Sequence, residues 1–229
     1  MLFHEVIERL HEFVSEDEFA DALRLARREF VTLRGDLFDS DSDYEARLGV
    51  FLDWFLSDRT VKIDGQSLSP VQYFINKHHG GLTPDVLAWL EAFRDSSLRL
   101  LLCKKVRKDG SAVFEDVVLN VKVDVMNAVE TFIALERKQL VEARLVDNCG
   151  EFLVSPYWLP RPNEGLKLIQ RSAKQFRSSF GHLDLESPDV SVELLKYIHR
   201  IAGLSNRANR YPHVQVIEIF EELREAPLA

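Results

Sequence analysis

The sequence predicts an α+β protein with N-terminal helices, a central antiparallel β-meander or small partly open barrel, and C-terminal helices. Three observations lead to this fold class. Apolar residues recur at helical spacing before residue 97, alternate with a period of two to about residue 155, and return to helical spacing beyond residue 161. We therefore divide the chain into an N-terminal helical region (1–96), a β domain (97–160) and a C-terminal helical region (161–229), which together can form one compact unit.

The first region is organised around a helix predicted from Tyr44 to Arg59. Its apolar face recurs at i, i+4, i+7, i+8 and i+11 and includes Phe55, with Trp54 on its flank, so we expect both side chains to be buried. Ser42 and Glu45 form a capping-box pattern at its start. Four further helices are predicted: Phe3 to Val14, Ser15 to Leu33 with a second capping box at Ser15 and Glu18, Ser69 to Lys77, and Thr83 to Phe93.

The central region has the period of β-strands. Asp109-Gly110 predicts a hairpin turn, and a second turn is predicted at Asn148-Cys149-Gly150. Strands are predicted at 97–103, 112–119, 121–125, 131–135, 141–146 and 151–155. Because no helix-length crossover separates them, we predict that neighbouring strands run antiparallel. The predicted buried surface of this sheet includes Leu100, Val118, Val123 and Leu145.

The third region begins after residues 156–163, where three prolines mark the boundary. Its first helix, from Leu166 to Phe180, is amphipathic, with basic residues opposite the apolar stripe. A second helix begins at Ser187-Pro188 and a final one near Pro212, with a short basic turn predicted at residues 206–210.

Charge and composition exclude several classes of protein. The net charge is −8, and residues 1–60 hold fifteen acidic against seven basic side chains, which argues against a nucleic-acid-binding field over the whole surface. No stretch is apolar enough to span a membrane, and polar residues occupy the place of a signal-peptide core. We expect a cytoplasmic protein that does not bind membranes, with Cys103 and Cys149 reduced.

Three short patterns resemble chemical sites. Asp39, Asp41 and Asp43 alternate as in a calcium loop but lack its glycine and distal glutamate. The adjacent His78 and His79 lack further ligands at zinc spacing. Cys149 has no neighbouring base in the sequence to activate it as a nucleophile. We therefore predict no catalytic residue, no metal and no cofactor.

A limited resemblance covers about residues 40 to 160. The run FLDWFLSDR, followed by Asp64-Gly65, Ser69-Pro70 and Phe74, resembles a segment of uncharacterised bacterial proteins that often carry a zinc-binding SEC-C motif. In that group a WFL-x-D helix leads through helices into a small β domain, which implies the same fold order here. This chain has Ser69-Pro70 where Thr-Pro is usual and lacks the cysteine-rich SEC-C tail, and the resemblance implies no activity.

The sequence favours a non-enzymatic interaction or adaptor protein that binds a protein partner or a second copy of itself. The first alternative is a nucleic-acid or nucleotide-binding protein. Its candidate binding residues are Lys167, Arg171, Lys174, Arg177, Arg207 and Arg210. The second alternative is an enzyme whose site is assembled from dispersed residues. Burial of Lys167 and Arg171 beneath the helices of residues 1–33 would remove the nucleic-acid alternative.

Overall fold

The computed structural model describes residues 2–36, 38–39, 41, 43–63, 65–132, 135–180 and 187–225. Helices precede and follow a central β-barrel, so the α+β fold class is confirmed. The N-terminal region contains α1 (Phe3–Val14), η1 (Asp17–Phe19), α2 (Ala20–Arg34), α3 (Tyr44–Ser57), α4 (Pro70–His78), η2 (His79–Gly81) and α5 (Pro84–Arg94). A hairpin of β1 (Val61–Ile63) and β2 (Gln66–Leu68), which the sequence analysis did not predict, lies between α3 and α4.

The helix ends differ in part from the predicted caps. Ser69 accepts a hydrogen bond from the Gln72 amide at 3.2 Å, as predicted for the start of α4. The capping box predicted at Ser15 is wrong, because the Ser15 hydroxyl donates to the His11 carbonyl and a 3₁₀ turn follows. Ser42 lies outside the described residues, and Asp43 occupies the N-cap position of α3 without a side-chain hydrogen bond. Gly35, at φ 83°, ends α2.

The barrel contains five strands, in the spatial order β3-β4-β5-β7-β6 before closing on β3. Their bounds are β3 (Ser97–Val106), β4 (Ala112–Asp116), β5 (Val121–Val125), β6 (Leu140–Asn148) and β7 (Glu151–Arg161). Four of the five pairings are antiparallel, whereas β5 and β7 run parallel and share the single pair Val125 and Phe152. The prediction of an exclusively antiparallel sheet is therefore wrong at this seam.

Two predicted strands also differ from the structure. Thr131 ends the short helix α6 (Ala128–Thr131) where a strand was predicted at 131–135, and residues 133–134 lie outside the described chain. The proline-rich stretch 156–163 does not interrupt the sheet, because β7 continues through Pro156 and Pro160 to Arg161. One edge of β7 pairs with β6, and its other edge has no partner strand at Pro156 among the described residues. A proline, which has no backbone N–H, is tolerated at such an unpaired edge.

The C-terminal region packs against the barrel and the N-terminal helices. It contains η3 (Asn163–Gly165), α7 (Leu166–Phe180), α8 (Pro188–Arg210), α9 (Val216–Phe220) and α10 (Glu222–Glu225). The turn predicted at residues 206–210 is wrong, since α8 continues as a helix to Arg210. No described helix has the length and apolar character needed to cross a membrane.

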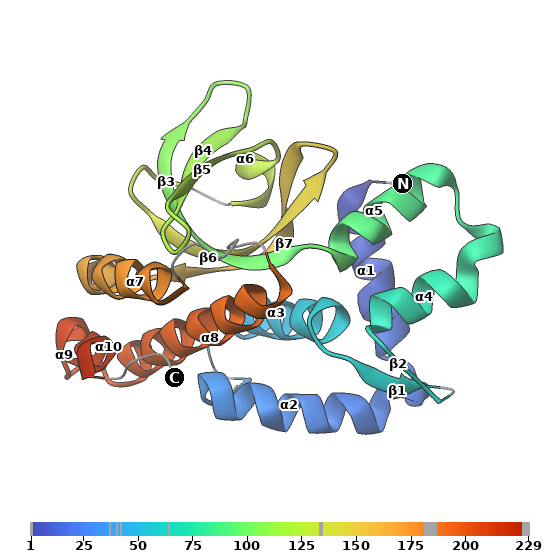
Figure 1. Cartoon of the computed structure of the whole chain (residues 1–229), viewed down its shortest axis with the longest axis horizontal. Coiled ribbons are helices and arrows are strands. Elements are labelled where there is room, and N and C mark those ends of the chain that lie inside the picture. The colour runs from blue at the N-terminus through green and yellow to red at the C-terminus, as the bar shows by residue number, and fades with distance from the viewer. Residues whose placement is uncertain are drawn as a thin grey trace.

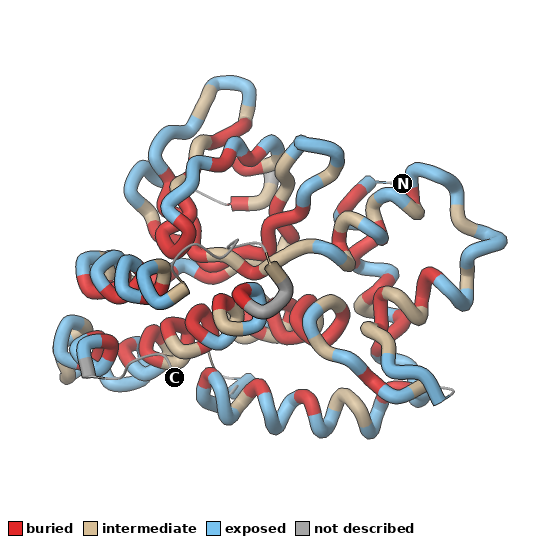
Figure 2. The backbone as a smooth tube through the Cα atoms, viewed as in Figure 1, coloured by how far each residue is buried: buried red, intermediate tan, exposed pale blue. Residues whose placement is uncertain are grey.

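The barrel stands on a layer formed by α3 and α8, with α2 on the far side of that layer (Figure 1). Buried residues concentrate where these layers meet (Figure 2). The predicted burial is confirmed, because Trp54 and Phe55 are 4% and 0% exposed and the four predicted sheet residues are at most 8% exposed. The single sheet surface predicted for those four is wrong, because Val118 lies in the turn after β4, and Leu100 and Val118 pack in a different core cluster from Val123 and Leu145. Val146 and Leu159 of the barrel join the core of the N-terminal helices, so the regions share apolar packing.

Candidate functional site

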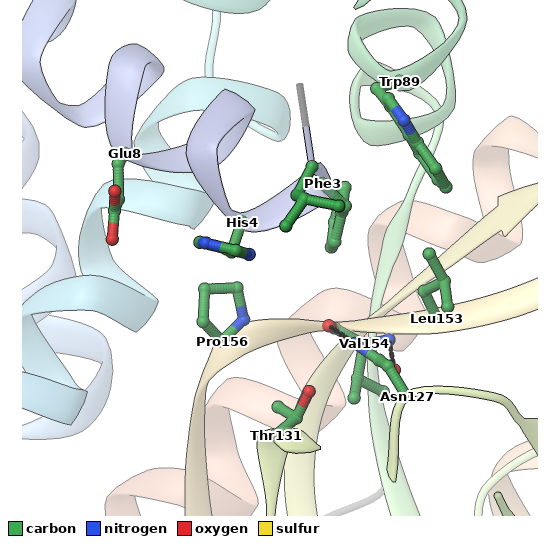
Figure 3. A pocket seen from close by; sticks show the side chains of 10 residues that line it. Phe3, His4, Glu8, Trp89, Asn127, Thr131, Leu153, Val154 and Pro156 are labelled. Carbon is green, nitrogen blue, oxygen red and sulfur yellow. Dashed lines mark hydrogen bonds between the residues drawn. The ribbon is translucent and has the colours of Figure 1, made fainter. Parts of the chain in front are cut away.

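A cleft lies between the N-terminal helices and β7, and we call it the aromatic cleft. Its volume is about 550 Å³, within the range of small-ligand sites. It is lined by Leu2, Phe3, His4, Glu8, Trp89, Asn127, Thr131, Leu153, Val154 and Pro156. Figure 3 shows Phe3, His4 and Glu8 of α1 and Trp89 of α5 on the helical side, opposite Leu153, Val154 and Pro156.

Aromatic and aliphatic side chains form most of the cleft wall. The rings of Phe3 and Trp89 lie with their centroids 5.2 Å apart and their planes tilted by 45°. Phe3 is buried, whereas Leu2 remains 64% exposed. The cleft therefore offers apolar and aromatic side chains to a ligand.

On the barrel side of the cleft, the backbone N–H and C=O of Val154, next to the parallel β5–β7 pair, are hydrogen-bonded. The Asn127 side-chain amide donates to the Val154 carbonyl and accepts from the Val154 amide, both at 3.0 Å (Figure 3). Asn127 thus continues the pairing of β7 beyond the Val125–Phe152 bridge, and Pro156 has no amide hydrogen to offer. The cleft therefore presents side chains to a ligand rather than a free strand edge.

A histidine, an aspartate and a serine lie together beside the cleft. Asp53 accepts from His11 Nε2 at 2.9 Å with one oxygen and from the Ser155 hydroxyl at 2.5 Å with the other. Because the carboxylate lies between the two groups, the hydroxyl is not hydrogen-bonded to the imidazole as a nucleophile is to its base. The His11 ring also stacks on Tyr157 with centroids 4.8 Å apart. These contacts join α1, α3 and β7 structurally.

A second polar feature is enclosed between the barrel and the helices. Five side chains make up what we call the buried charged cluster: Arg34, Asp58, Glu142, Arg144 and Arg161. Four of these side chains are at most 2% exposed, whereas that of Asp58 lies at the edge of the cluster and is 16% exposed. Glu142 is fully buried and binds Arg34 Nη1 at 2.5 Å and Arg161 Nη2 at 2.6 Å. Burial alone would raise the pKa of Glu142, but the charges of Arg161 and Arg34 outweigh it and hold the pKa below its usual value.

The remaining pair of the cluster is Asp58 and Arg144, which are hydrogen-bonded to each other. Burial raises the pKa of Asp58 even though the Arg144 charge opposes the shift. The cluster contains three guanidinium groups and two carboxylates, which leaves one positive charge when all five are ionised. Ion pairs of this kind contribute little net stability but become costly when one partner is removed.

His199 extends this cluster into α8. Its Nδ1 accepts a 2.6 Å hydrogen bond from Arg34 Nε. Burial and the charges of Arg34 and Arg144 lower the pKa of His199 to about 2, so the ring is neutral at pH 7. A guanidinium donates only, so Nδ1 carries the lone pair and Nε2 carries the proton. Among the described residues, this Nε2–H has no hydrogen-bond acceptor.

The candidate nucleic-acid residues are separated into two groups by the structure. Lys167, Arg171 and Lys174 are exposed along one side of α7, and the helices of residues 1–33 do not cover them. The other three are held in structural contacts: Arg177 donates to the Val117 and Val118 carbonyls, Arg207 pairs with Glu222, and Arg210 donates to the Asp36 carbonyl. The structure therefore does not bring all six residues into one binding surface.

The other sequence patterns occupy structural positions. Asp41 binds Arg47 Nη1 at 2.6 Å, which occupies an oxygen that a calcium ion would need. His78 packs against Phe74 with ring centroids 4.6 Å apart. Cys149 is exposed in the β6–β7 turn. In the part of the chain that the structure describes, no three His, Cys, Asp or Glu side chains are grouped as metal ligands.

The fold and these features define an α+β protein with a central five-stranded mixed barrel, an aromatic cleft and a buried charged cluster. No protein-family profile, curated protein or solved structure matches the chain. The SEC-C-like resemblance thus remains a prediction, and any function must be argued from the chain's own residues.

Proposed function

We propose that this is an interaction protein that binds a short extended segment of a partner protein in the aromatic cleft. The observation that carries the proposal is the cleft itself, where Phe3 and Trp89 form an aromatic wall opposite Leu153 and Pro156. Residues that dominate the binding energy at protein interfaces are enriched in tryptophan, and large rings bury a wide area with few rotatable bonds. An aliphatic or aromatic side chain of the segment would occupy this wall.

Charge at the cleft favours a segment of one chemical type. Glu8 lines the cleft, is exposed, and forms no ion pair in the described chain. Glu12 is a further exposed carboxylate one turn along α1, and the first 60 residues have a net charge of −8, equal to that of the whole chain. Charge complementarity favours a partner with a lysine or arginine next to its apolar anchor. We therefore propose a basic, apolar segment as the occupant.

Selection from a displayed random peptide library on the full-length chain tests this proposal. We expect enriched peptides to share an apolar residue close to a lysine or arginine. Glu8→Arg should weaken such a peptide by about tenfold, because it replaces attraction by repulsion at the rim. Trp89→Ala should weaken it further by removing part of the aromatic wall.

Glu218→Arg is the control, because Glu218 is exposed on α9, at the opposite end of the molecule from α1 (Figure 1), and does not line the cleft. It should leave peptide affinity within about twofold of the parent at moderate salt, where charges beyond roughly 10 Å are screened. A library without enrichment, or equal losses from Glu8→Arg and Glu218→Arg, would contradict binding in the cleft.

A second candidate function is binding of single-stranded nucleic acid. The observation that favours it is the row of Lys167, Arg171 and Lys174, which is exposed on a helix without acidic residues. The barrel adds a fold-level analogy, since five-stranded Greek-key barrels of the OB type bind oligonucleotides. In chain order, α6 lies between the third barrel strand, β5, and the fourth, β6. The third and fifth strands, β5 and β7, run parallel.

Titration with a fluorescent single-stranded oligonucleotide at two salt concentrations tests this second function. Changing Lys167, Arg171 and Lys174 together to glutamate should abolish binding and its salt dependence, because each phosphate contact releases counterions. Lys62→Glu on the β1–β2 hairpin is a control for loss of positive charge elsewhere. Binding that the triple variant leaves intact would exclude α7 as the nucleic-acid surface.

A further inference from the structure

A separate pocket of about 450 Å³ lies between α2, the end of α3 and α8, and we call it the α2–α8 pocket. Its lining includes Leu33, Trp54, Val192, Leu195, Lys196 and His199. Leu33 and Val192 are 38% and 54% exposed, so both contribute apolar surface that solvent reaches. His199, in contrast, is 98% buried, since only 2% of its surface is exposed.

His199 is one of the lining residues and has an unused hydrogen-bond donor. Its Nδ1 is occupied by Arg34 Nε at 2.6 Å, so the proton resides on Nε2. Nε2 is buried and has no acceptor in the described part of the protein. Native proteins satisfy nearly all buried polar groups, so a donor of this kind indicates an absent partner.

The charged cluster beside His199 contains more positive than negative groups. Two other buried nitrogens without hydrogen-bond partners, Arg34 Nη2 and Arg144 Nε, belong to the same charged cluster. All unpaired buried side-chain atoms found among the described residues are nitrogens, and none is a carboxylate oxygen. The three guanidinium groups of the cluster exceed its two carboxylates by one charge. One anionic group would accept a hydrogen bond from His199 Nε2 and balance the excess positive charge of the cluster.

We propose that the α2–α8 pocket binds a small carboxylate with an apolar body, whose carboxylate accepts a hydrogen bond from His199 Nε2–H. The apolar body would lie against Leu33, Trp54 and Val192. The two acidic residues that line the pocket do not oppose this ligand as free charges, since Asp58 pairs with Arg144 and Glu29 with Arg59. Lys196, which also lines the pocket, is likewise paired, with Glu193 at 2.6 Å. This site is distinct from the aromatic cleft.

Titration of the full-length protein with benzoate, followed by NMR of the histidine ring nitrogens, tests the proposal. We expect a saturable shift of the His199 Nε2 signal with benzoate and none with benzyl alcohol, which has a similar ring but no charge. His199→Asn should lose benzoate binding, because asparagine can still accept from Arg34 but does not reach the position of Nε2. Absence of a saturable shift, or an equal response to benzyl alcohol, would overturn the proposal.

Two substitutions of Val192 keep the test valid if His199→Asn does not fold. Val192 is 54% exposed, so its replacement leaves the core intact. Val192→Glu should weaken benzoate at least tenfold by repulsion, whereas Val192→Lys should match or strengthen it. Val121→Glu, at an exposed valine on β5, controls for the change in net charge. Equal benzoate affinity of the two Val192 variants would place the ligand elsewhere and overturn the proposal.

Discussion

Glu142 is the residue on which the buried charged cluster depends. It is fully buried, and both of its oxygens bind arginines that are themselves 1–2% exposed. Glu142→Gln preserves the shape of the side chain but leaves Arg34 and Arg161 without their counter-charge. We expect it to reduce the free energy of unfolding by about 3 to 5 kcal/mol, measured by urea denaturation.

Glu115→Gln is the matched control for this substitution. Glu115 pairs with Lys104 at 2.8 Å, and their side chains are 22% and 42% exposed. Because solvent screens such a pair, its loss should cost less than about 1 kcal/mol. Similar losses in the two variants would show that the buried cluster does not need its central carboxylate.

His199 makes stability depend on pH. Its pKa is about 2 in the folded protein against an ordinary value of 6.5, so below pH 6.5 the unfolded chain binds a proton that the folded chain does not. This contribution to stability is fully present above pH 6.5 and is lost as the pH falls, by roughly 1 kcal/mol per pH unit. Urea denaturation at pH 7 and pH 5.5 measures the loss.

His199→Asn removes this titration and should lose less stability than the parent between the two pH values. The raised pKa of Asp58 acts in the opposite direction, because its folded form binds the proton more readily. Since Asp58 is present in both proteins, its effect cancels in the comparison. Equal pH dependence of parent and variant would contradict a neutral buried His199.

At the scale of single elements, α3 is a helix whose burial the sequence predicts correctly. Its dense apolar stripe predicted a buried helix, and Phe55 is 0% exposed. Phe55→Ala should lower the free energy of unfolding by about 3 to 5 kcal/mol, because it leaves a cavity. Phe38→Ala, at a phenylalanine that is 48% exposed, should change it much less. Urea denaturation of both variants checks this, and a near-zero loss at Phe55 would contradict its role in the core.

Sequence periodicity did not predict α6 or the parallel pairing of β5 with β7. Residues 131–135 contain apolar residues that suit a strand, yet the chain makes a helical turn from Ala128 to Thr131. The parallel contact between β5 and β7 consists of one backbone pair, Val125 and Phe152, and the hydrogen bonds of the Asn127 side chain. Neither produces a periodic pattern in the sequence. Sequence patterns report which residues are buried, whereas strand order depends on contacts far apart in the chain.

The candidate sites were missed for a related reason. Glu142 and Arg144 lie among apolar residues in the sequence of β6. Apolar residues at both odd and even positions indicate a strand that is buried on both faces, and this pattern was the one available signal. Their partners Arg34, Asp58 and Arg161 come from distant segments, so pairing could not be derived from spacing. The aromatic cleft likewise joins α1, α5 and β7. By contrast, exposure of Lys167 and Arg171 agrees with the amphipathic pattern of α7.

On the scale of the whole molecule, the three regions of the sequence share their cores. Val146 and Leu159 of the barrel pack into the N-terminal core, and Leu98 and Leu100 pack with α7 and α8. The charged cluster crosses the same boundaries, since Arg34 of α2 binds Glu142 of β6 and Asn206 of α8 donates to the Arg34 carbonyl. Loss of one region would expose apolar and charged groups of the other two.

We therefore predict that the chain unfolds in one cooperative transition. The protein has three tryptophans, of which Trp158 lies in the barrel and Trp54 and Trp89 in helices. In the variant with Trp54→Phe and Trp89→Phe, Trp158 fluorescence reports the barrel while far-UV circular dichroism reports mainly the helices. We expect the same urea midpoint from both signals, because a two-state unfolding gives coincident transitions for all probes. Two separate midpoints would show that the barrel and the helical regions are independent domains.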